Sequence, residues 1–165
     1  MANNSVNSSV IGVNLQGNSD GATANFGLGQ HVLGNASTEW VYVNAGLAIT
    51  TGQIVGINAT FTATPATATV AFAGQQLAFA QGAFAASDYG WVALRGDNLV
   101  VALSGVSTLG AALYIGNSGQ ITTAAASGTL AGVTILSASA TGILNAATTA
   151  YVSWPRLSAG ALFGV

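Results

Sequence analysis

The chain has 165 residues, and 4% of them are charged: Lys+Arg total 2, both arginine, and Asp+Glu total 4. Two arginines and no lysine argue against nucleic-acid binding, because the affinity of such binding depends on neutralising phosphates. The absence of cysteine excludes disulfides, thiol catalysis and cysteine-ligated zinc.

The first 25 residues are rich in Asn, Ser and Gly, with a short apolar patch at residues 10–13. This composition predicts a flexible N-terminal arm, residues 1–25, that becomes ordered on binding a partner. Residues 1–20 lack the basic and apolar regions of a secretory signal peptide. We therefore expect the arm to serve in binding.

From residue 26 onwards, short apolar runs alternate with Gly, Asn and Ser. Residues 38–43 place aromatic side chains on one face and valines on the other, which is typical of a strand. Pro65 is expected at a turn or at a sheet edge, because proline lacks the N–H that a central strand donates. The predicted strands cover residues 38–43, 53–57, 60–64, 67–72, 90–94, 99–103, 111–115, 120–123, 130–136 and 150–154.

Several segments between these strands carry turn or helix signals. Gly96-Asp97-Asn98 predicts a turn between the strands at 90–94 and 99–103. The Ala-rich residues 82–86 and 141–147 are compatible with single helical turns, because alanine has the highest helix propensity.

About ten short strands at spacings of roughly 8–12 residues predict an all-β protein, a barrel or a sandwich. We expect a single β domain over residues 26–157, followed by a C-terminal tail at 158–165. The uncharged residues 99–116 are long enough for a membrane helix. Their central Gly, Ser and Thr and the absence of flanking basic residues favour two strands instead, so no membrane partner is expected.

The sequence offers little for catalysis. His31 is the single histidine, and no serine lies in a G-x-S-x-G motif. The four acidic residues show no spacing that pairs them for glycoside hydrolysis, and no His cluster or Asp ladder predicts a metal site. We therefore expect no enzyme activity, no catalytic residues, no metal and no cofactor.

Two other patterns have a plain structural interpretation. Arg95-Gly96-Asp97 spells the integrin-type tripeptide, which at a strand end is expected to be a chance match. Tyr89, Trp91 and Tyr114 would suit a sugar-stacking platform, but aromatic residues in a β domain are more often core. We expect Trp91 to be a core residue.

Two sequence blocks resemble small structural proteins of tailed-bacteriophage virions, the capsid decoration (cement, or head-stabilising) type. The first runs from Gly34 through Trp40-Val41-Tyr42-Val43 to residue 55. The second contains the Tyr-Gly-Trp-Val strand at residues 89–92, a Leu-Tyr pair at 113–114, and the ending Trp154-Pro155-Arg156. The resemblance covers about residues 30–157.

The resemblance implies a protein that binds the outside of a phage capsid and stabilises the shell by bridging major capsid subunits. Such proteins often form trimers, so the implied partners are the major capsid protein and further copies of this chain. It also implies synthesis in the bacterial cytoplasm and residence on the capsid surface of the virion. The family has no catalytic residues to transfer.

A surface so poor in charge must either be wetted by Asn, Gln, Ser and Thr or be covered by other protein. Because interface cores are depleted of charge, coverage agrees with the resemblance. Two alternatives stay open: a phage tail, fibre or spike component, and a secreted β-rich surface adhesin suggested by Thr-Ala alternation at 60–69. The predicted capsid or oligomer interface residues are Val10, Ile11, Val13 and Leu15 in the arm and Glu39, Arg95, Asp97 and Arg156 at strand ends, where a rim ion pair or a register-setting contact is expected.

Overall fold

The structure, a computed structural model, describes residues 19–35, 37–67, 74–105, 109–124, 129–137 and 144–158, without the side chains of residues 144–147. Strands make up 57% of these residues, so the predicted all-β class is confirmed. Within these ranges the helical structure is one short 3-10 turn, η2 (Asn117–Gly119). The strands are β1 (Ser19–Gly21), β2 (His31–Leu33), β3 (Glu39–Ala45), β4 (Ile54–Ile57), β5 (Thr62–Pro65), β6 (Gln76–Ala80), β7 (Tyr89–Ser104), β8 (Tyr114–Ile115), β9 (Ile121–Thr122), β10 (Thr129–Ile135) and β11 (Leu144–Ser158).

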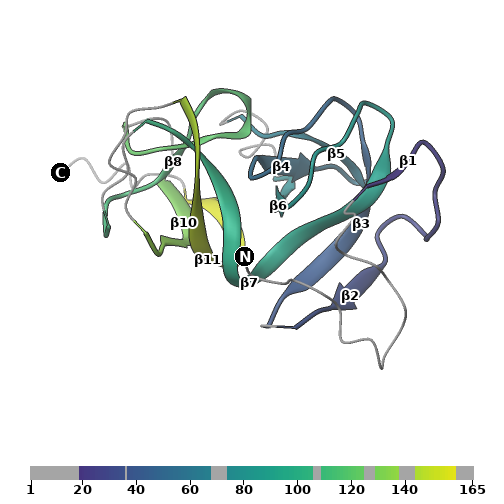
Figure 1. Cartoon of the computed structure of the whole chain (residues 1–165), viewed down its shortest axis with the longest axis horizontal. Coiled ribbons are helices and arrows are strands. Elements are labelled where there is room, and N and C mark those ends of the chain that lie inside the picture. The colour runs from purple at the N-terminus through teal and green to yellow at the C-terminus, as the bar shows by residue number, and fades with distance from the viewer. Residues whose placement is uncertain are drawn as a thin grey trace.

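Five of these strands close into a barrel (Figure 1). β7 pairs with β6, β6 with β4, β4 with β5, β5 with β3, and β3 pairs with β7 again, so the hydrogen-bonded order returns to its start. Every pairing is antiparallel except that of β3 with β5. One hydrophobic cluster draws residues from all five strands and fills the barrel: Val41, Val43, Ala45, Ile49, Val55, Ile57, Ala63, Ala78, Ala80, Phe84, Val92 and Leu94.

Strand β7 belongs to two parts of the molecule, and Figure 1 shows it bending between them. Its first half lies between β3 and β6 in the barrel, whereas its second half pairs with β11, which in turn pairs with β10. The predicted turn at residues 96–98 is therefore wrong. Asn98 adopts a φ of 56°, and the β7–β11 register shifts between Ala150 and Val152, so the chain bulges and continues instead of reversing.

A second hydrophobic cluster covers the outer face of the barrel strands. Trp40 and Tyr42 of β3, Phe79 of β6 and Trp91 of β7 pack there with the inner side chains of β10 and β11, including Ile135. The predicted core position of Trp91 is confirmed, since the residue is 1% exposed. Because both faces of β3 are covered, its burial pattern is nearly continuous.

Other sequence expectations are corrected by long-range pairing. Residues 144–147, predicted as part of a helical turn, belong to β11, while 141–143 lie outside the described residues. In the segment 82–86, Phe84 forms an isolated bridge with Ile49 instead of a helical turn. β6 was not predicted, because its sequence Gln-Leu-Ala-Phe-Ala is short and Ala-rich.

Pro65 is the last residue of β5 and is paired with Val55 of β4. Because β5 lies between β4 and β3, Pro65 sits at a strand end and not at the turn or sheet edge that the sequence predicted. The predicted strand at 67–72 lies almost wholly outside the described residues. The described part of the chain holds no helix with the length and apolar character needed to cross a membrane.

Candidate functional site

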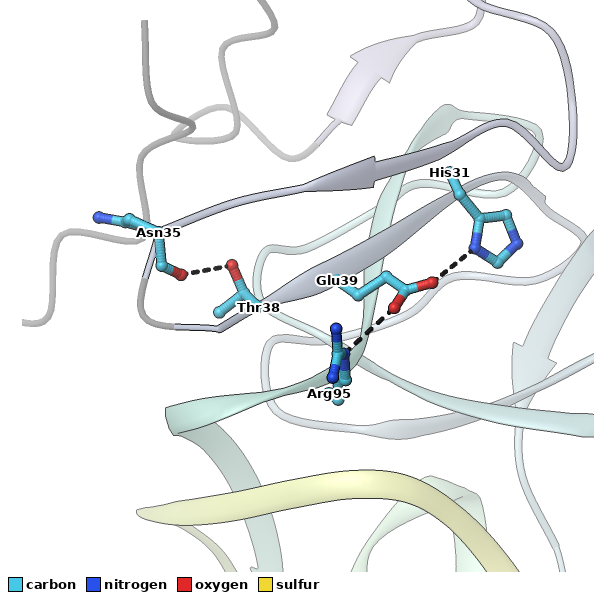
Figure 2. A network of polar contacts seen from close by, with 5 residues as sticks. All are labelled: His31, Asn35, Thr38, Glu39 and Arg95. Atoms are coloured by element: carbon cyan, nitrogen blue, oxygen red, sulfur yellow. Dashed lines mark hydrogen bonds and ion pairs between the residues drawn. The ribbon is translucent and has the colours of Figure 1, made fainter. Parts of the chain in front are cut away.

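Glu39 lies at the centre of a polar network formed by β2, β3 and β7. One carboxylate oxygen, Oε1, lies 3.0 Å from Nδ1 of His31, and the other, Oε2, accepts a hydrogen bond of 3.1 Å from Nε of Arg95. Figure 2 shows both contacts meeting at the Glu39 carboxylate. The Glu39 side chain is 15% exposed, against 43% for His31 and 41% for Arg95.

The network follows directly from strand register. Glu39 pairs with Leu33 on β2 and with Arg95 on β7. A carboxylate facing a cation across two antiparallel strands favours that register, because a slip by one residue would move the two charges to opposite faces. Of the predicted interface residues, Glu39 and Arg95 are therefore brought together, and they engage each other in a register-setting contact.

The turn before β3 packs tightly against the bulge of β7. The Thr38 hydroxyl donates a hydrogen bond of 2.7 Å to the carbonyl oxygen of Asn35 (Figure 2). Gly96 has a φ of 153°, and a Cβ there would collide with the Thr38 methyl group. Glycine at this position lets the turn and the bulge approach closely.

The segment from Ser19 to Asn25 is fixed to the outside of the barrel. The Tyr42 hydroxyl donates a hydrogen bond of 2.6 Å to Oδ2 of Asp20 and accepts one of 3.0 Å from the backbone N–H of Asn25. Ser19 donates to Oδ2 of Asp88 at 3.0 Å, and β1 pairs with β7. Residues 19–25 of the predicted arm thus contact the barrel.

Burial and the hydrogen bond to Asp20 raise the pKa of Tyr42 to about 12. Burial has the larger effect, because an ionised phenolate inside the cluster would lose its hydration. The Asp20 carboxylate acts in the same direction, since it accepts a proton that only the neutral phenol carries. The neutral Tyr42 hydroxyl therefore serves as a structural donor.

The remaining predicted interface residues fall into two groups. Val10, Ile11, Val13 and Leu15 lie outside the described residues. Asp97, in the bulge of β7, and Arg156, on β11, are both exposed. Neither side chain takes part in a hydrogen bond or an ion pair within the described part of the chain.

Strand β11 presents two exposed aromatic side chains close to these charges. Tyr151 is 45% exposed and Trp154 is 41% exposed, while the intervening Val152 is buried. In register, Tyr151 lies opposite Asp97 and Asn98 of β7, because Ala150 pairs with Leu99 and Val152 with Gly96. The four residues Asp97, Tyr151, Trp154 and Arg156 are called the β11 face below.

Trp154 has an uncommon backbone conformation. Its φ is 48°, and the β10–β11 register shifts beside it, between Ala131 and Val133. Gly132 of β10, with a φ of 80°, lies directly against this bulge. A Cβ at residue 132 would collide with the carbonyl oxygens of Ser153 and Trp154. A bulky residue held at positive φ costs about 1–3 kcal/mol. The sequence analysis missed this bulge; the signal that could have indicated it is Pro155, which cannot donate a hydrogen bond in a regular ladder.

Two surface hollows are weaker candidates for a ligand site. One, of about 460 Å³, lies beside β4 and β6 and is lined by Ile57, Asn58, Ala59, Gly74, Gln75 and Gln76. The other, of about 190 Å³, separates β10 from the segment before β8 and is lined by Gly110, Ala111, Leu113, Val133, Thr134 and Ile135. Neither lining contains a titratable side chain.

The part of the chain that the structure describes holds no cluster of three or more His, Cys, Asp or Glu side chains that could bind a metal ion. The one described histidine, His31, contacts the Glu39 carboxylate, and the two are linked to Arg95. This network can fix strand positions, and the β11 face can bind another surface.

Comparisons with models of known protein families, with curated proteins and with solved structures found no match. The chain is an all-β protein with a five-stranded barrel, and it exposes two aromatic side chains on the β11 face.

Proposed function

We propose that this chain is a structural virion protein that binds the outside of a phage capsid and stabilises the shell by bridging major capsid subunits. The observation that carries the proposal is the β11 face, where Tyr151 and Trp154 stand exposed in a chain with almost no charged surface. The sequence resemblance to capsid decoration proteins narrows the partner from protein in general to a capsid.

The chemistry of the surface supports binding to protein. Trp, Tyr and Arg are the residues that most often dominate binding energy at protein interfaces. The β11 face contributes one of each, at Trp154, Tyr151 and Arg156. Elsewhere, Glu39 already forms an ion pair with Arg95. A partner protein that covered that region would therefore not bury an unpaired charge.

The rigidity of the barrel supports a bridging role. Both faces of β3 and of the first half of β7 are buried, so the barrel resists deformation when its neighbours move. A specific interface covers about 1,600 Å² in total, and repetition of one such contact around a shell adds avidity. Further copies of this chain, as the trimer that the resemblance implies, would multiply the contacts again.

The direct test is co-expression with the major capsid protein encoded in the same genome. Shells isolated by sedimentation are expected to carry many copies of the chain over their whole surface and to rupture at a higher temperature than bare shells. Leu47→Ser changes an exposed residue away from the β11 face. This variant is the control for expression and folding, and it should bind the shells as the unmodified chain does. Shells that sediment without the chain, and rupture at the same temperature with or without it, would contradict the proposal.

Electron microscopy of complete virions separates this proposal from the alternatives. A capsid role places the chain across the head, whereas a tail, fibre or spike component would be found at one vertex only. Recovery of the chain on the surface of uninfected cells would favour the adhesin. The Thr-Ala stretch gives that adhesin little support, since Ala63 within it is buried in the barrel.

A further inference from the structure

Strand β2 lies at an edge of the sheet, because the pairing order that starts at β10 ends with β2. Figure 1 shows β2 outermost, beside β3. Its sequence His-Val-Leu contains no lysine and no proline, the residues with which proteins often protect an exposed edge. At the other end of the order, β10 is partly covered, since the backbone N–H of Leu130 donates a hydrogen bond of 2.7 Å to the carbonyl oxygen of Leu113. Within the described residues, the chain therefore leaves β2 as an open edge.

The hydrogen bonds between β2 and β3 determine which backbone groups of β2 stay unpaired. Gly34, directly after β2, donates its backbone N–H to the carbonyl oxygen of Thr38 at 2.9 Å. Bonded and non-bonded pairs alternate along an antiparallel ladder, so the next residue that bonds to β3 is Val32. The N–H and C=O groups of His31 and Leu33 point away from β3, and they have no hydrogen-bond partner in the described part of the chain.

The side chains along this edge share one face of the sheet. Leu33 pairs with Glu39 in register, and side chains directly opposite each other on neighbouring strands lie on the same face. His31, two residues before Leu33, lies on that face as well and contacts the Glu39 carboxylate, which also binds Arg95 (Figure 2). Leu33 is 65% exposed, the largest fraction among the exposed large hydrophobic residues of the described chain. The edge therefore offers an apolar contact, and its two opposite charges already form an ion pair.

The Glu39 carboxylate fixes the hydrogen-bonding role of His31. A carboxylate only accepts hydrogen bonds, so in the neutral imidazole the proton lies on Nδ1, which is 3.0 Å from Oε1 of Glu39. The other ring nitrogen, Nε2, is then an acceptor, and it has no hydrogen-bond partner among the described residues. A side chain that packs beside His31 should therefore offer a neutral donor, such as the hydroxyl of threonine or serine.

We propose that β2 binds an extended, uncharged segment of another protein, which joins the sheet as an antiparallel strand. The backbone of this segment exchanges hydrogen bonds with His31 and Leu33, whose N–H and C=O groups are unpaired. An apolar side chain opposite Leu33 and a hydroxyl opposite His31 give the sequence preference. This surface uses none of the residues of the β11 face, so it is a binding site beyond the proposed function.

The chain holds β2 in place before any partner arrives. Tyr42 donates its backbone N–H to the carbonyl oxygen of Gln30 at 2.9 Å, on the residue directly before β2, and the bond of Gly34 fixes the other end. Val32 packs against the cluster on the outer face of the barrel. A strand that is already ordered loses little conformational entropy on binding, which favours recognition through a short edge.

The first test uses a synthetic peptide, acetyl-Ser-Val-Val-Thr-Ser-amide, whose first valine lies opposite Leu33 and whose threonine lies opposite His31. Titrated into the full chain, the peptide should shift the backbone amide NMR resonances of both residues, with a dissociation constant of about 1 mM because the edge is short. Methylating the backbone nitrogen of the first valine or of the threonine should weaken binding at least about tenfold, since each loses a donated hydrogen bond. The same methyl group on the second valine, whose N–H points away from β2, is the matched control and should leave binding unchanged.

Variants of the chain test the sequence preference. Leu33→Lys should weaken peptide binding at least about tenfold, because a charge replaces the apolar contact. Leu47→Lys, at an exposed residue outside β2, should leave binding and the melting temperature unchanged, and an unchanged melting temperature is also expected for Leu33→Lys. A peptide with valine in place of threonine should bind the unmodified chain about threefold more weakly, because it lacks the hydroxyl donor. His31→Phe should bind both peptides equally.

Several results would overturn the inference. These are the absence of resonance shifts at about 5 mM peptide, equal weakening by all three methyl positions, and binding that Leu33→Lys does not change. Shifts of the His31 and Leu33 amides with protein concentration alone would identify a second copy as the occupant. Peptide binding only after removal of residues 1–18 would identify the chain's own N-terminal residues, and either occupant contradicts the inference. The purified chain is measured without a capsid, so failure here is distinct from failure of the proposed function.

Discussion

The barrel and the β11 face both display a tryptophan on a strand, yet the two residues have opposite surroundings. Trp91 on β7 is 1% exposed and packs between the barrel and the β10–β11 strands. Trp154 on β11 is 41% exposed and has a φ of 48°. Packing determines the position of the first, and a backbone bulge determines that of the second.

The difference shows how a chain with so few charges divides its surface. Around the barrel, apolar side chains on both faces of β3 and β7 are covered by other parts of the same chain. On β11, one face packs inward through Val152, while the other leaves large aromatic residues open. The barrel is complete within the chain, and the β11 face is suited to a partner.

The largest expected contrast comes from truncating each tryptophan in turn. Trp91→Ala should lower the free energy of unfolding by about 3–5 kcal/mol, because it empties a large core volume. Trp154→Ala should lower it by well under about 1 kcal/mol in the monomer, since little packing is lost. Chemical denaturation of both variants measures the contrast, and similar losses for the two would remove the distinction between core and face.

Alkaline pH should weaken the contact between Tyr42 and residues 19–25. The folded pKa is about 12, above the unfolded value of 10.0, so this stabilisation is fully present below pH 10. Between pH 10 and 12 the unfolded state ionises first, so the free energy of unfolding should fall by roughly 2–3 kcal/mol over this range.

The phenylalanine variant isolates this effect from the other tyrosines. The free energy of unfolding should fall more steeply with pH in the unmodified protein than in Tyr42→Phe over the same range. Parallel curves for the two proteins would show that Tyr42 ionises at its ordinary pKa in the folded state.

Two truncations test where the arm begins to matter for stability. Removing residues 1–20 deletes Asp20 and leaves the buried Tyr42 hydroxyl without its charged acceptor, whereas removing residues 1–18 keeps it. The longer truncation should therefore be less stable than the shorter by about 1–3 kcal/mol, measured by thermal unfolding.

The shorter truncation also tests the predicted role of Val10, Ile11, Val13 and Leu15 on a capsid. Removal of residues 1–18 should reduce retention on heated shells, because these apolar residues are expected to bind neighbouring subunits. Unchanged occupancy would assign the capsid contacts to other surfaces.

The smallest effect is expected at the Glu39 network. Glu39→Gln keeps the shape of the side chain but removes its charge between His31 and Arg95, and should lower the free energy of unfolding by about 1 kcal/mol. Asp97→Asn is the matched control and should change it by less than about 0.5 kcal/mol. Equal effects in urea titrations would mean that the Glu39 contacts contribute nothing to stability.

Much of the local structure could be predicted from the sequence. Aromatic and β-branched alternation correctly predicted β3. The usual burial of aromatic residues in β domains also predicted that Trp91 is a core residue. These predictions succeeded because the residues involved carry strong local preferences that the fold does not override.

Local preference failed where distant pairing decided the structure. Ala-rich residues 144–147 form a strand because β7 offers them a partner ladder, although alanine alone favours a helix. Residues 96–98 form a bulge instead of a turn. The first half of β7 pairs with β3 and its second half pairs with β11, so the strand continues through these residues. Neither pairing is visible in a short window of sequence.

The sequence by itself determined that this protein is all-β, poor in charge and without a recognisable catalytic motif. It also predicted Glu39, Arg95, Asp97 and Arg156 at strand ends, which is correct for Glu39, the first residue of β3, but wrong for Arg95 and Asp97, which lie in the middle of β7. Only the tertiary structure decided that Glu39 binds Arg95, 56 residues away, while Asp97 and Arg156 stay exposed beside Tyr151 and Trp154. The physical reason is register: which side chains meet depends on which strands pair, and strand pairing is settled by long-range contacts.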